Sequence, residues 1–213
     1  MTDRRPSRIL VLAPHVDDVE FGCGGSVARF IDQGVDVHYV AFSVASKSVR
    51  TGLPRDILAQ EAELAARELG IDWDNVRILD LPVREFPAHR QEILEELIHV
   101  REELHPTWVL LPASSDVHQD HRVIHEEGVR AFKRCTVLAY EEPWNSLAEE
   151  TRGLILIEPE HLDRKLRAIA CYQSQDHRAY ADPEFIRGLA RVRGVQAGSQ
   201  FAEAFEVIRW VVE

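Results

Sequence analysis

The sequence predicts a single α/β domain of three layers, in which helices cover both faces of a mostly parallel sheet. Short apolar runs alternate with longer amphipathic segments from residue 9 to residue 140, which is the pattern of βαβ units. The length of 213 residues suits one domain with a substantial core, and no repeat, low-complexity tract or linker interrupts it. We therefore expect residues 1–213 to form one domain.

Apolar runs bounded by charge, proline or glycine predict the strands. The first, residues 9–12, is continuously apolar, as expected for a strand buried on both faces of a sheet. Residues 35–42 and 201–212 instead alternate apolar with polar side chains. The predicted strands cover residues 9–12, 35–42, 76–79, 108–111, 137–140, 154–157 and 201–212.

Apolar side chains at helical spacing predict the helices between these strands. The clearest covers residues 57–69, whose apolar side chains share one face and which Gly70 ends. Pro106 marks the end of one helix, and Pro159 suits the first turn of another. The predicted helices cover residues 26–33, 57–69, 92–104, 118–132, 159–172 and 183–192.

The composition argues against several classes of protein. The formal net charge of −11, from 36 acidic and 25 basic residues, repels nucleic acid and anionic membranes. No apolar run approaches the roughly 20 residues that a membrane span needs. The first residues are polar and basic, unlike a secretory signal, and the three cysteines are odd in number and widely spaced. We expect a cytoplasmic protein with reduced thiols and no nucleic-acid or membrane partner.

Two groups of polar side chains follow predicted strands at the points where those strands end. In an open α/β sheet, sites form beyond the carboxyl ends of the strands. Imidazole nitrogens and carboxylate oxygens are the ligands of a hydrolytic zinc ion that keeps an open coordination position. The two groups are His15, Asp17 and Asp18, and Asp116, His118, Asp120 and His121.

Spacing within the first group separates two roles. His15 and Asp18 are three residues apart, so in a turn or a helical start they can face one point. Asp17 adjoins Asp18 and cannot share its direction, although it must lie close by. One aspartate can therefore bind a metal while the other takes a proton from a water molecule.

The second group repeats this spacing, because His118 and His121 are also three residues apart. Asp120 can orient one of the two imidazoles. Either group alone is compatible with a helix cap and a solvated imidazole, since short motifs match by chance. The presence of both groups, each at a strand end of one small domain, favours a metal site.

The glycines after the first group have a structural interpretation. Gly22, Gly24 and Gly25 do not have the G-x-G-x-x-G spacing, and no P-loop lysine follows them. We expect them to allow close packing of a helix on a strand. Cys23 is then a small packed residue and not a nucleophile.

The two metal-type groups carry a resemblance to a known family. Residues 14–20, P-H-V-D-D-V-E, followed by G-C-G-G at 22–25, resemble the A-H-P-D-D-x-E…G-x-G-G signature of the PIG-L/LmbE-like zinc-dependent N-acetylglucosaminyl deacetylases. Residues 118–121, H-Q-D-H, resemble the H-P-D-H motif of that family. The resemblance spans nearly the whole chain. Its further matches are Glu61…Leu69-Gly70, Tyr172-Gln173-Ser174-Gln175 and Ala202-Glu203-Ala204-Phe205.

The resemblance implies a Rossmann-like fold of the LmbE type and a metal-dependent hydrolase. Carried over by position, it makes His15, Asp18 and His121 the ligands of Zn²⁺, with Fe²⁺ or another divalent metal as alternatives. The implied reaction removes an N-acetyl group from an N-acetylglucosamine-containing small molecule or glycoconjugate and releases acetate.

The resemblance also assigns the residues that act on the substrate. Asp17 matches the general base, which takes a proton from water and returns one to the departing amine. His118 matches the group that stabilises the oxyanion, and the resemblance has it protonated and oriented by Asp120. The aglycone and the pathway stay open, and so does the oligomeric state, a homo-oligomer included.

Three positions depart from the family pattern. Val16 and Gln119 replace the prolines of the two motifs, which should alter loop stiffness more than chemistry. Leu58 stands where the family often has an arginine, so any substrate contact of that arginine must come from another residue or be absent. The candidates to replace it are Lys47, Arg50 and Arg55.

Further candidates for substrate binding lie late in the chain. Arg178 and Tyr180 are expected to line a sugar pocket together with Trp144, whose ring can stack on a pyranose or serve only as a packed aromatic side chain. Glu141 and Asn145 are weaker candidates. Two alternatives to the deacetylase remain, a metal hydrolase of another amide or ester and a non-catalytic sugar-binding relative. Arg50, Trp144, Arg178 and Tyr180 are the residues that we expect to bind substrate.

Overall fold

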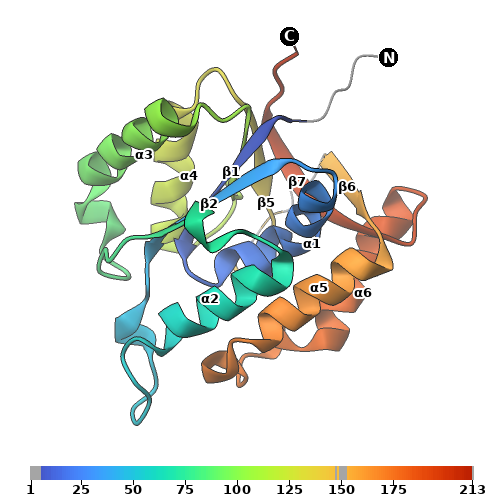
Figure 1. The fold of residues 1–213 in the computed structure, drawn as a ribbon, viewed down its shortest axis with the longest axis horizontal. Coiled ribbons are helices and arrows are strands. Elements are labelled where there is room, and N and C mark those ends of the chain that lie inside the picture. The colour runs from blue at the N-terminus through green and yellow to red at the C-terminus, as the bar shows by residue number, and fades with distance from the viewer. Residues whose placement is uncertain (1–5, 147, 149–152, 213) are drawn as a thin grey trace.

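The computed structural model describes residues 6–146, 148 and 153–212, and these form a seven-stranded sheet in the order β3-β2-β1-β4-β5-β7-β6 (Figure 1). β1 to β5 pair in parallel, whereas β7 is antiparallel to both β5 and β6. The strands are β1 (Arg8–His15), β2 (Asp36–Ser43), β3 (Val76–Ile78), β4 (Trp108–Pro112), β5 (Thr136–Tyr140), β6 (Gly153–Ile157) and β7 (Phe201–Arg209).

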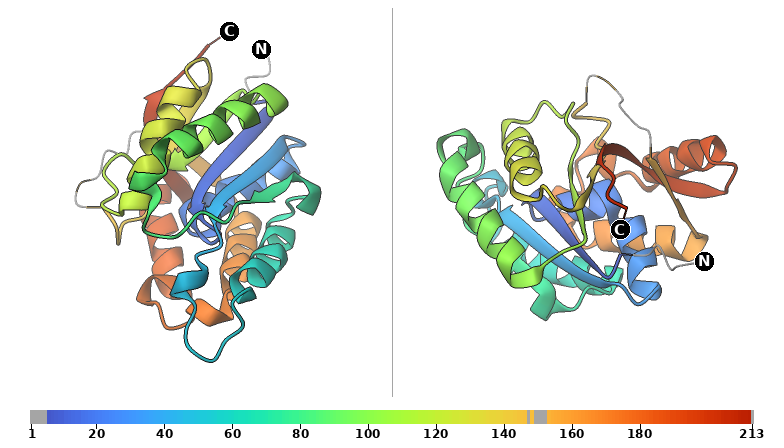
Figure 2. Two further views of the ribbon diagram at one scale, coloured as in Figure 1. Left: turned by 90° about the vertical axis from the view of Figure 1, so that its left-hand side faces the viewer. Right: turned by 90° about the horizontal axis from the view of Figure 1, so that it is seen from above.

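Helices cover both faces of the sheet (Figure 2). α1, α2 and α5 pack on one another over one face, and α3 packs on α4 over the other. Each face has its own apolar core, and the side chains of β1 contribute to both. The predicted fold class, α/β with a mostly parallel sheet between helices, is therefore confirmed. The helices are α1 (Asp18–Asp32), α2 (Ile57–Leu69), α3 (Arg90–Leu104), α4 (Gln119–Ala131), α5 (Pro159–Ala170) and α6 (Pro183–Gln196).

The strand order reverses between β1 and β4. These two strands are neighbours and parallel, yet α1 follows β1 onto one face and α4 follows β4 onto the other. Such a switch point leaves a crevice at the carboxyl ends of the two strands. Both predicted metal-type groups lie at this crevice. None of the helices in the described part of the chain is long and apolar enough to cross a membrane.

The start of α1 differs from the prediction, which placed residues 14–25 in a loop and began the helix at residue 26. The helix begins at Asp18 and bends at Cys23, whose φ of −146° and ψ of 20° are not helical. Glycines lower helix propensity, but here they permit close packing. A Cβ at Gly22 would collide with the Tyr140 ring, and one at Gly25 would lie 2.7 Å from Ile157 Cδ1. The expectation of packing glycines thus agrees with the structure.

A carboxylate from the last strand holds the second part of α1. Glu203 accepts hydrogen bonds from the backbone N–H groups of Gly25, at 3.0 Å, and Ser26, at 2.6 Å. The Lys165 ammonium lies 2.6 Å from the same carboxylate, and both side chains are buried. Glu203 thereby satisfies the first N–H groups of the helical segment that follows the bend at Cys23. The buried ammonium of Lys165 balances the charge of the Glu203 carboxylate.

Removing the cation from this pair should destabilise the protein strongly. Breaking a buried ion pair by deleting one partner typically costs about 3–5 kcal/mol, because the other charge is left uncompensated. We expect Lys165→Met to lower the free energy of unfolding by an amount in that range, as measured by urea denaturation. Adding Glu203→Gln to Lys165→Met should recover part of the loss. Wild-type stability in the single variant would contradict this account.

Candidate metal centre and active site

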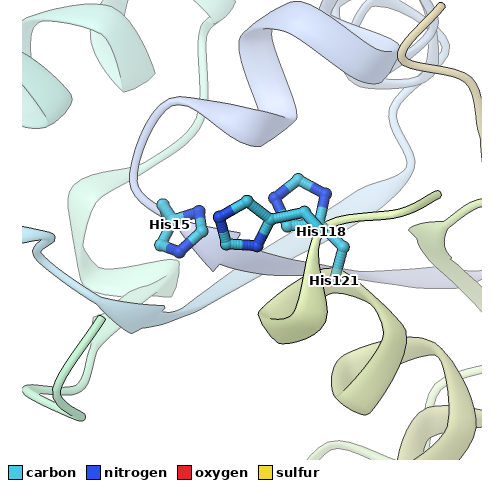
Figure 3. A group of neighbouring side chains, drawn as sticks. All are labelled: His15, His118 and His121. Atoms are coloured by element: carbon cyan, nitrogen blue, oxygen red, sulfur yellow. The ribbon is translucent and has the colours of Figure 1, made fainter. Parts of the chain in front are cut away.

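Three imidazole rings meet at the switch point. His15 comes from the end of β1, and His118 and His121 come from the start of α4 (Figure 3). The ring centroids are 5.1 Å apart for His15 and His118, 5.3 Å for His15 and His121, and 4.7 Å for His118 and His121. The parallel pairing of β1 with β4 therefore brings together side chains that lie about a hundred residues apart in the sequence.

Asp18 joins two of these rings into a donor set that fits a metal ion. Its Oδ2 lies 3.3 Å from His15 Nδ1 and 3.4 Å from His121 Nε2. Atoms that bind one tetrahedral zinc ion at about 2.0–2.2 Å lie roughly 3.3–3.6 Å from one another. These two distances and the chemistry of the donors therefore suit one divalent ion at the residues that the resemblance implies as ligands.

The electrostatics of this donor set favour a cation. Burial opposes a charge on His15, yet Asp18 and Asp120 beside it raise its pKa to about 10. Burial also opposes the charge on Asp18, but His121 and His15 lower its pKa to about 2. A positive charge at this point is thus stabilised by carboxylates that stay ionised.

Each of the two imidazoles in the donor set, His15 and His121, is oriented by a further carboxylate. Asp120 Oδ2 lies 3.1 Å from His15 Nε2, and Asp116 Oδ2 lies 2.8 Å from His121 Nδ1. In each case the bonded nitrogen donates its proton to the carboxylate, which leaves the other nitrogen to face Asp18. This carboxylate–histidine arrangement is the one that commonly supports metal-binding imidazoles.

The sequence analysis assigned Asp116 no role, although the residue stood in the second polar group. Asp116 is buried, and its Oδ1 also accepts a hydrogen bond from the backbone of His118 at 2.8 Å. It therefore holds both the His118 backbone and the His121 ring. Its position directly after β4 was the available signal, but spacing alone does not tell which ring nitrogen meets a carboxylate.

We expect Asp116→Asn to weaken metal binding without abolishing it. Partners of metal-binding histidines typically contribute about 10–100-fold to metal affinity. The dissociation constant for Zn²⁺, measured by competition with a chromophoric chelator, should rise by that factor. Asp74→Asn, the same change at an exposed position, serves as the control. An unchanged dissociation constant in Asp116→Asn would show that the hydrogen bond to His121 does not support binding.

Asp120 differs from the role that the resemblance implied, which was to orient a protonated His118. Its carboxylate instead contacts His15 and accepts a 2.6 Å hydrogen bond from the backbone N–H of Arg84. Its link to His118 is a backbone N–H that donates to Nδ1 at 3.2 Å. The reason is geometric: His118 is the N-cap of α4, so its ring bends back over the first helical N–H groups.

His118 is consequently a neutral imidazole with a free N–H donor. Burial, together with the charge of His121 and His15, lowers its pKa to about 4. Because Nδ1 accepts the backbone N–H, the ring proton is on Nε2. His118 can still donate a hydrogen bond to a developing negative oxygen, although it does so uncharged and not as the cation that was expected.

Asp17 stands at the N-cap position of α1 but does not cap the helix with its side chain. Its carboxylate lines the cavity in front of the donor set and remains half-buried. Burial and the neighbouring charge of Asp18 raise its pKa to about 6. A carboxylate with this pKa, next to a candidate metal site, is suited to accept a proton near neutral pH.

The cavity that contains these groups has a volume of about 270 Å³ and an aromatic wall. Trp144 and Tyr180 are stacked, with ring centroids 4.4 Å apart and planes 9° from parallel. Phe21 meets both rings edge-on. The structure thus places two of the predicted substrate-binding residues in the cavity and adds Phe21, which the sequence analysis did not single out.

The predicted substrate-binding arginines fall in different places. Arg178 lines the cavity, where its Nε donates to Gln175 Oε1 at 2.7 Å and its guanidinium lies over Tyr180. Arg50 instead pairs with Asp176 at the exposed surface and is not among the residues found to line the cavity, so its predicted role is not supported. Leu58, which stands where the family often has an arginine, is buried in the cavity wall and brings no charge to it.

Glu142, immediately after β5, also lines the cavity. It is 3 % exposed, and its Oε2 accepts a hydrogen bond from Asn145 Nδ2 at 3.1 Å. Burial, with Asp18 and Asp116 nearby, raises its pKa well above the usual range. The sequence analysis did not identify this residue, because a single glutamate after a strand carries no pattern.

The fold and this site together define an α/β protein with a candidate divalent-metal centre at the switch point of its sheet. The sequence profile of the PIG-L family, described as GlcNAc-PI de-N-acetylase, matches residues 10–132, which is more than half of the chain. The chain therefore belongs to the PIG-L family, as its motifs indicated.

Individual relatives extend the similarity to nearly the whole chain. A diacetylchitobiose deacetylase of Thermococcus kodakarensis is 26% identical over 94% of this chain and 83% of its own length. The solved N,N'-diacetylchitobiose deacetylase of Pyrococcus horikoshii has the same fold, with a TM-score of 0.79 and 21% identity over 95% of this chain and 84% of that one. A 4-oxalmesaconate hydratase of Pseudomonas putida is also 26% identical, over 88% of this chain and 80% of its own length.

Proposed function

We propose that this protein is a metal-dependent N-deacetylase that hydrolyses the acetamido group of an N-acetylglucosamine-containing small molecule or glycoconjugate and releases acetate. The observation that carries the proposal is the pairing of Asp17, a carboxylate free to act as a base, with the donor set of His15, Asp18 and His121. Membership of the PIG-L family and the similarity to diacetylchitobiose deacetylases support the choice of substrate.

Zn²⁺ is the ion that we propose for the donor set, with Fe²⁺ as the alternative. When bound, a divalent ion supplies Lewis-acid activation of a water molecule and of the amide carbonyl. Asp18 Oδ2 lies at tetrahedral spacing from one nitrogen of each histidine, which suits zinc with an open position. Asp120 and Asp116 hold the two imidazoles in the tautomers that such binding requires.

The remaining steps use side chains of the chain itself. Asp17 removes a proton from the attacking water, whose oxygen bonds to the acetamide carbon. The Nε2–H of His118 donates to the carbonyl oxygen as negative charge builds on it. The C–N bond then breaks, Asp17 returns the proton to the departing nitrogen, and acetate and a free amine are the products. Phe21, Trp144 and Tyr180 form the wall on which the sugar ring rests.

The class of partner is proposed from the composition of the chain. The acidic chain favours a small-molecule amino sugar over nucleic acid as the partner, and we propose a cytoplasmic location for the reaction. The similarity to a hydratase means that the family alone does not fix the reaction. The aromatic wall of the cavity favours the uncharged sugar over a small dicarboxylate.

An acetate-release screen tests this function. The protein, reconstituted separately with Zn²⁺ and Fe²⁺, is incubated with N-acetylglucosamine, diacetylchitobiose and N-acetylglucosaminyl conjugates, and acetate is measured by a coupled enzymatic assay. We expect release from at least one of these compounds and none from the metal-free protein. Hydration of an unsaturated dicarboxylate, or phosphate release from esters, without acetate from any amino sugar would overturn the proposal.

A further inference from the structure

Glu142 has one carboxyl oxygen that no described residue satisfies. Oε2 is held by Asn145, but Oε1 is buried and has no hydrogen-bond partner. Leaving a buried polar atom unpaired is unfavourable, so native proteins rarely do it without a functional reason. Glu142 lines the cavity, and Oε1 is covered in this structure, so a bound molecule can satisfy Oε1 when the carboxyl group turns toward it.

The geometry around His121 argues against Glu142 as a metal ligand. Donor atoms of Asp18, His121 and Glu142 lie within 4.8 Å of one another. However, Glu142 Oε2 is 3.9 Å from His121 Nδ1, and that nitrogen is already bonded to Asp116. The nitrogen that faces Asp18 is Nε2. His121 therefore uses Nδ1 for Asp116 and Nε2 for Asp18, and its contact with Glu142 Oε2 is the longer one.

The neighbours of Glu142 in the cavity have the chemistry of a sugar-binding site. Phe21 and Trp144 present apolar rings, and the Asn145 amide stands next to the carboxyl group. A sugar ring combines apolar C–H faces with hydroxyl groups at its rim, which matches rings beside a carboxyl group. A hydroxyl is both donor and acceptor, so it can pair with Glu142 whether or not the carboxyl carries a proton.

We propose that Glu142 Oε1 is a specificity-determining contact that accepts a hydrogen bond from the C3 hydroxyl of the N-acetylhexosamine. This inference rests on the proposed function. The carboxyl group lies within 4.8 Å of the donors that meet the scissile amide, so only a hydroxyl close to that amide can reach it. The nitrogen is on C2, and C1 carries the aglycone in a conjugate, which leaves the hydroxyl on C3.

The test compares Glu142 variants on substrates with and without this hydroxyl. The substrates are an N-acetylglucosamine glycoside and its 3-deoxy and 4-deoxy analogues, and the variants are Glu142→Ala, Glu142→Gln and the control Glu206→Gln. Glu206 contacts Ser114 at the surface, outside the cavity lining. Acetate release gives kcat and KM, and binding to the Asp17→Asn background, measured by calorimetry, gives Kd without turnover.

We expect the wild type to lose about 10–100-fold in kcat/KM on the 3-deoxy analogue, because without the C3 hydroxyl a buried carboxyl oxygen is left without a partner. Glu142→Ala should lose the same factor on the parent glycoside and nothing further on the 3-deoxy analogue. Its response to the 4-deoxy analogue should match that of the wild type. Glu142→Gln should recover part of the loss, and Glu206→Gln should behave as wild type. Metal content should be equal in all four proteins.

Three results would overturn the inference. They are unchanged kcat/KM in Glu142→Ala, an equal 3-deoxy penalty in Glu142→Ala and wild type, and loss of metal from the variant. A merely structural role would lower the melting temperature and leave the ratio between the two substrates as it is in the wild type. Absence of acetate from every amino sugar would instead defeat the proposed function, and the binding series would still decide whether Glu142 contacts the C3 hydroxyl.

Discussion

Replacing Asp17 with asparagine should lower kcat for acetate release by about 10²–10⁴-fold, the range in which a positioned general base contributes. Asparagine has nearly the same shape but cannot take a proton from water. Because the Asp17 carboxylate does not cap α1, the change should leave the helix and the stability of the protein intact. Metal content should also stay at the wild-type level, since the donor set lies on other residues.

The dependence on pH gives this prediction a second readout. Asp17 has a pKa raised to about 6 and must be ionised to act as a base, so activity should rise as pH increases through about 6 and fall below it. The residual activity of Asp17→Asn should lack this acidic limb. Asp74→Asn, a control at an exposed position, should keep the wild-type kcat and the wild-type loss of activity at acidic pH. Near wild-type kcat in Asp17→Asn with metal bound would show that another group is the base.

Loss of a metal donor should remove both metal binding and activity. Zn²⁺ at 100–1,000 times its Kd should stabilise the wild type by about 2.7–4.1 kcal/mol, which corresponds to roughly 5–15 °C in melting temperature for a chain of this size. His121→Ala should show no such shift and no acetate release. Chelation of the wild type should reproduce both effects, and added Zn²⁺ should reverse them.

The matched variant for this experiment is His118→Ala. Its ring lies as close to His15 as that of His121 does, so proximity alone does not separate a ligand from an oxyanion donor. If His118 only donates a hydrogen bond, its loss should cost about 10²–10³-fold in kcat while the Zn²⁺-induced shift in melting temperature persists. Loss of that shift would make His118 a ligand.

The sequence predicted most of the fold because the local signals agreed with the packing. Residues 57–69 have a clear apolar face and a terminal glycine, and α2 has the same bounds. The start of α1 was missed because its glycines argue locally against a helix. Their role depends on Tyr140 and Ile157, which approach from distant strands. Tertiary contacts therefore decided an element that propensity misjudged.

For the site, the sequence identified which residues would lie together, but not the orientations of their side chains. Two strand-end groups with matching spacing were enough to bring His15, Asp18 and His121 together in the prediction. The pairing of Asp120 with His15 depends on ring orientations that spacing does not encode. Arg50 was expected to supply the substrate contact of the family's arginine, whereas its partner Asp176 holds it at the surface.

The bond between Glu203 and the N–H groups of Gly25 and Ser26 also governs when the site can assemble. It joins residues 177 and 178 positions apart in the sequence, so the first helix depends on the last strand. Residues 10–132, which match the family profile, contain every proposed metal donor but neither Glu203 nor Lys165. During synthesis, the nascent chain should therefore acquire tight metal binding only after β7 has left the ribosome.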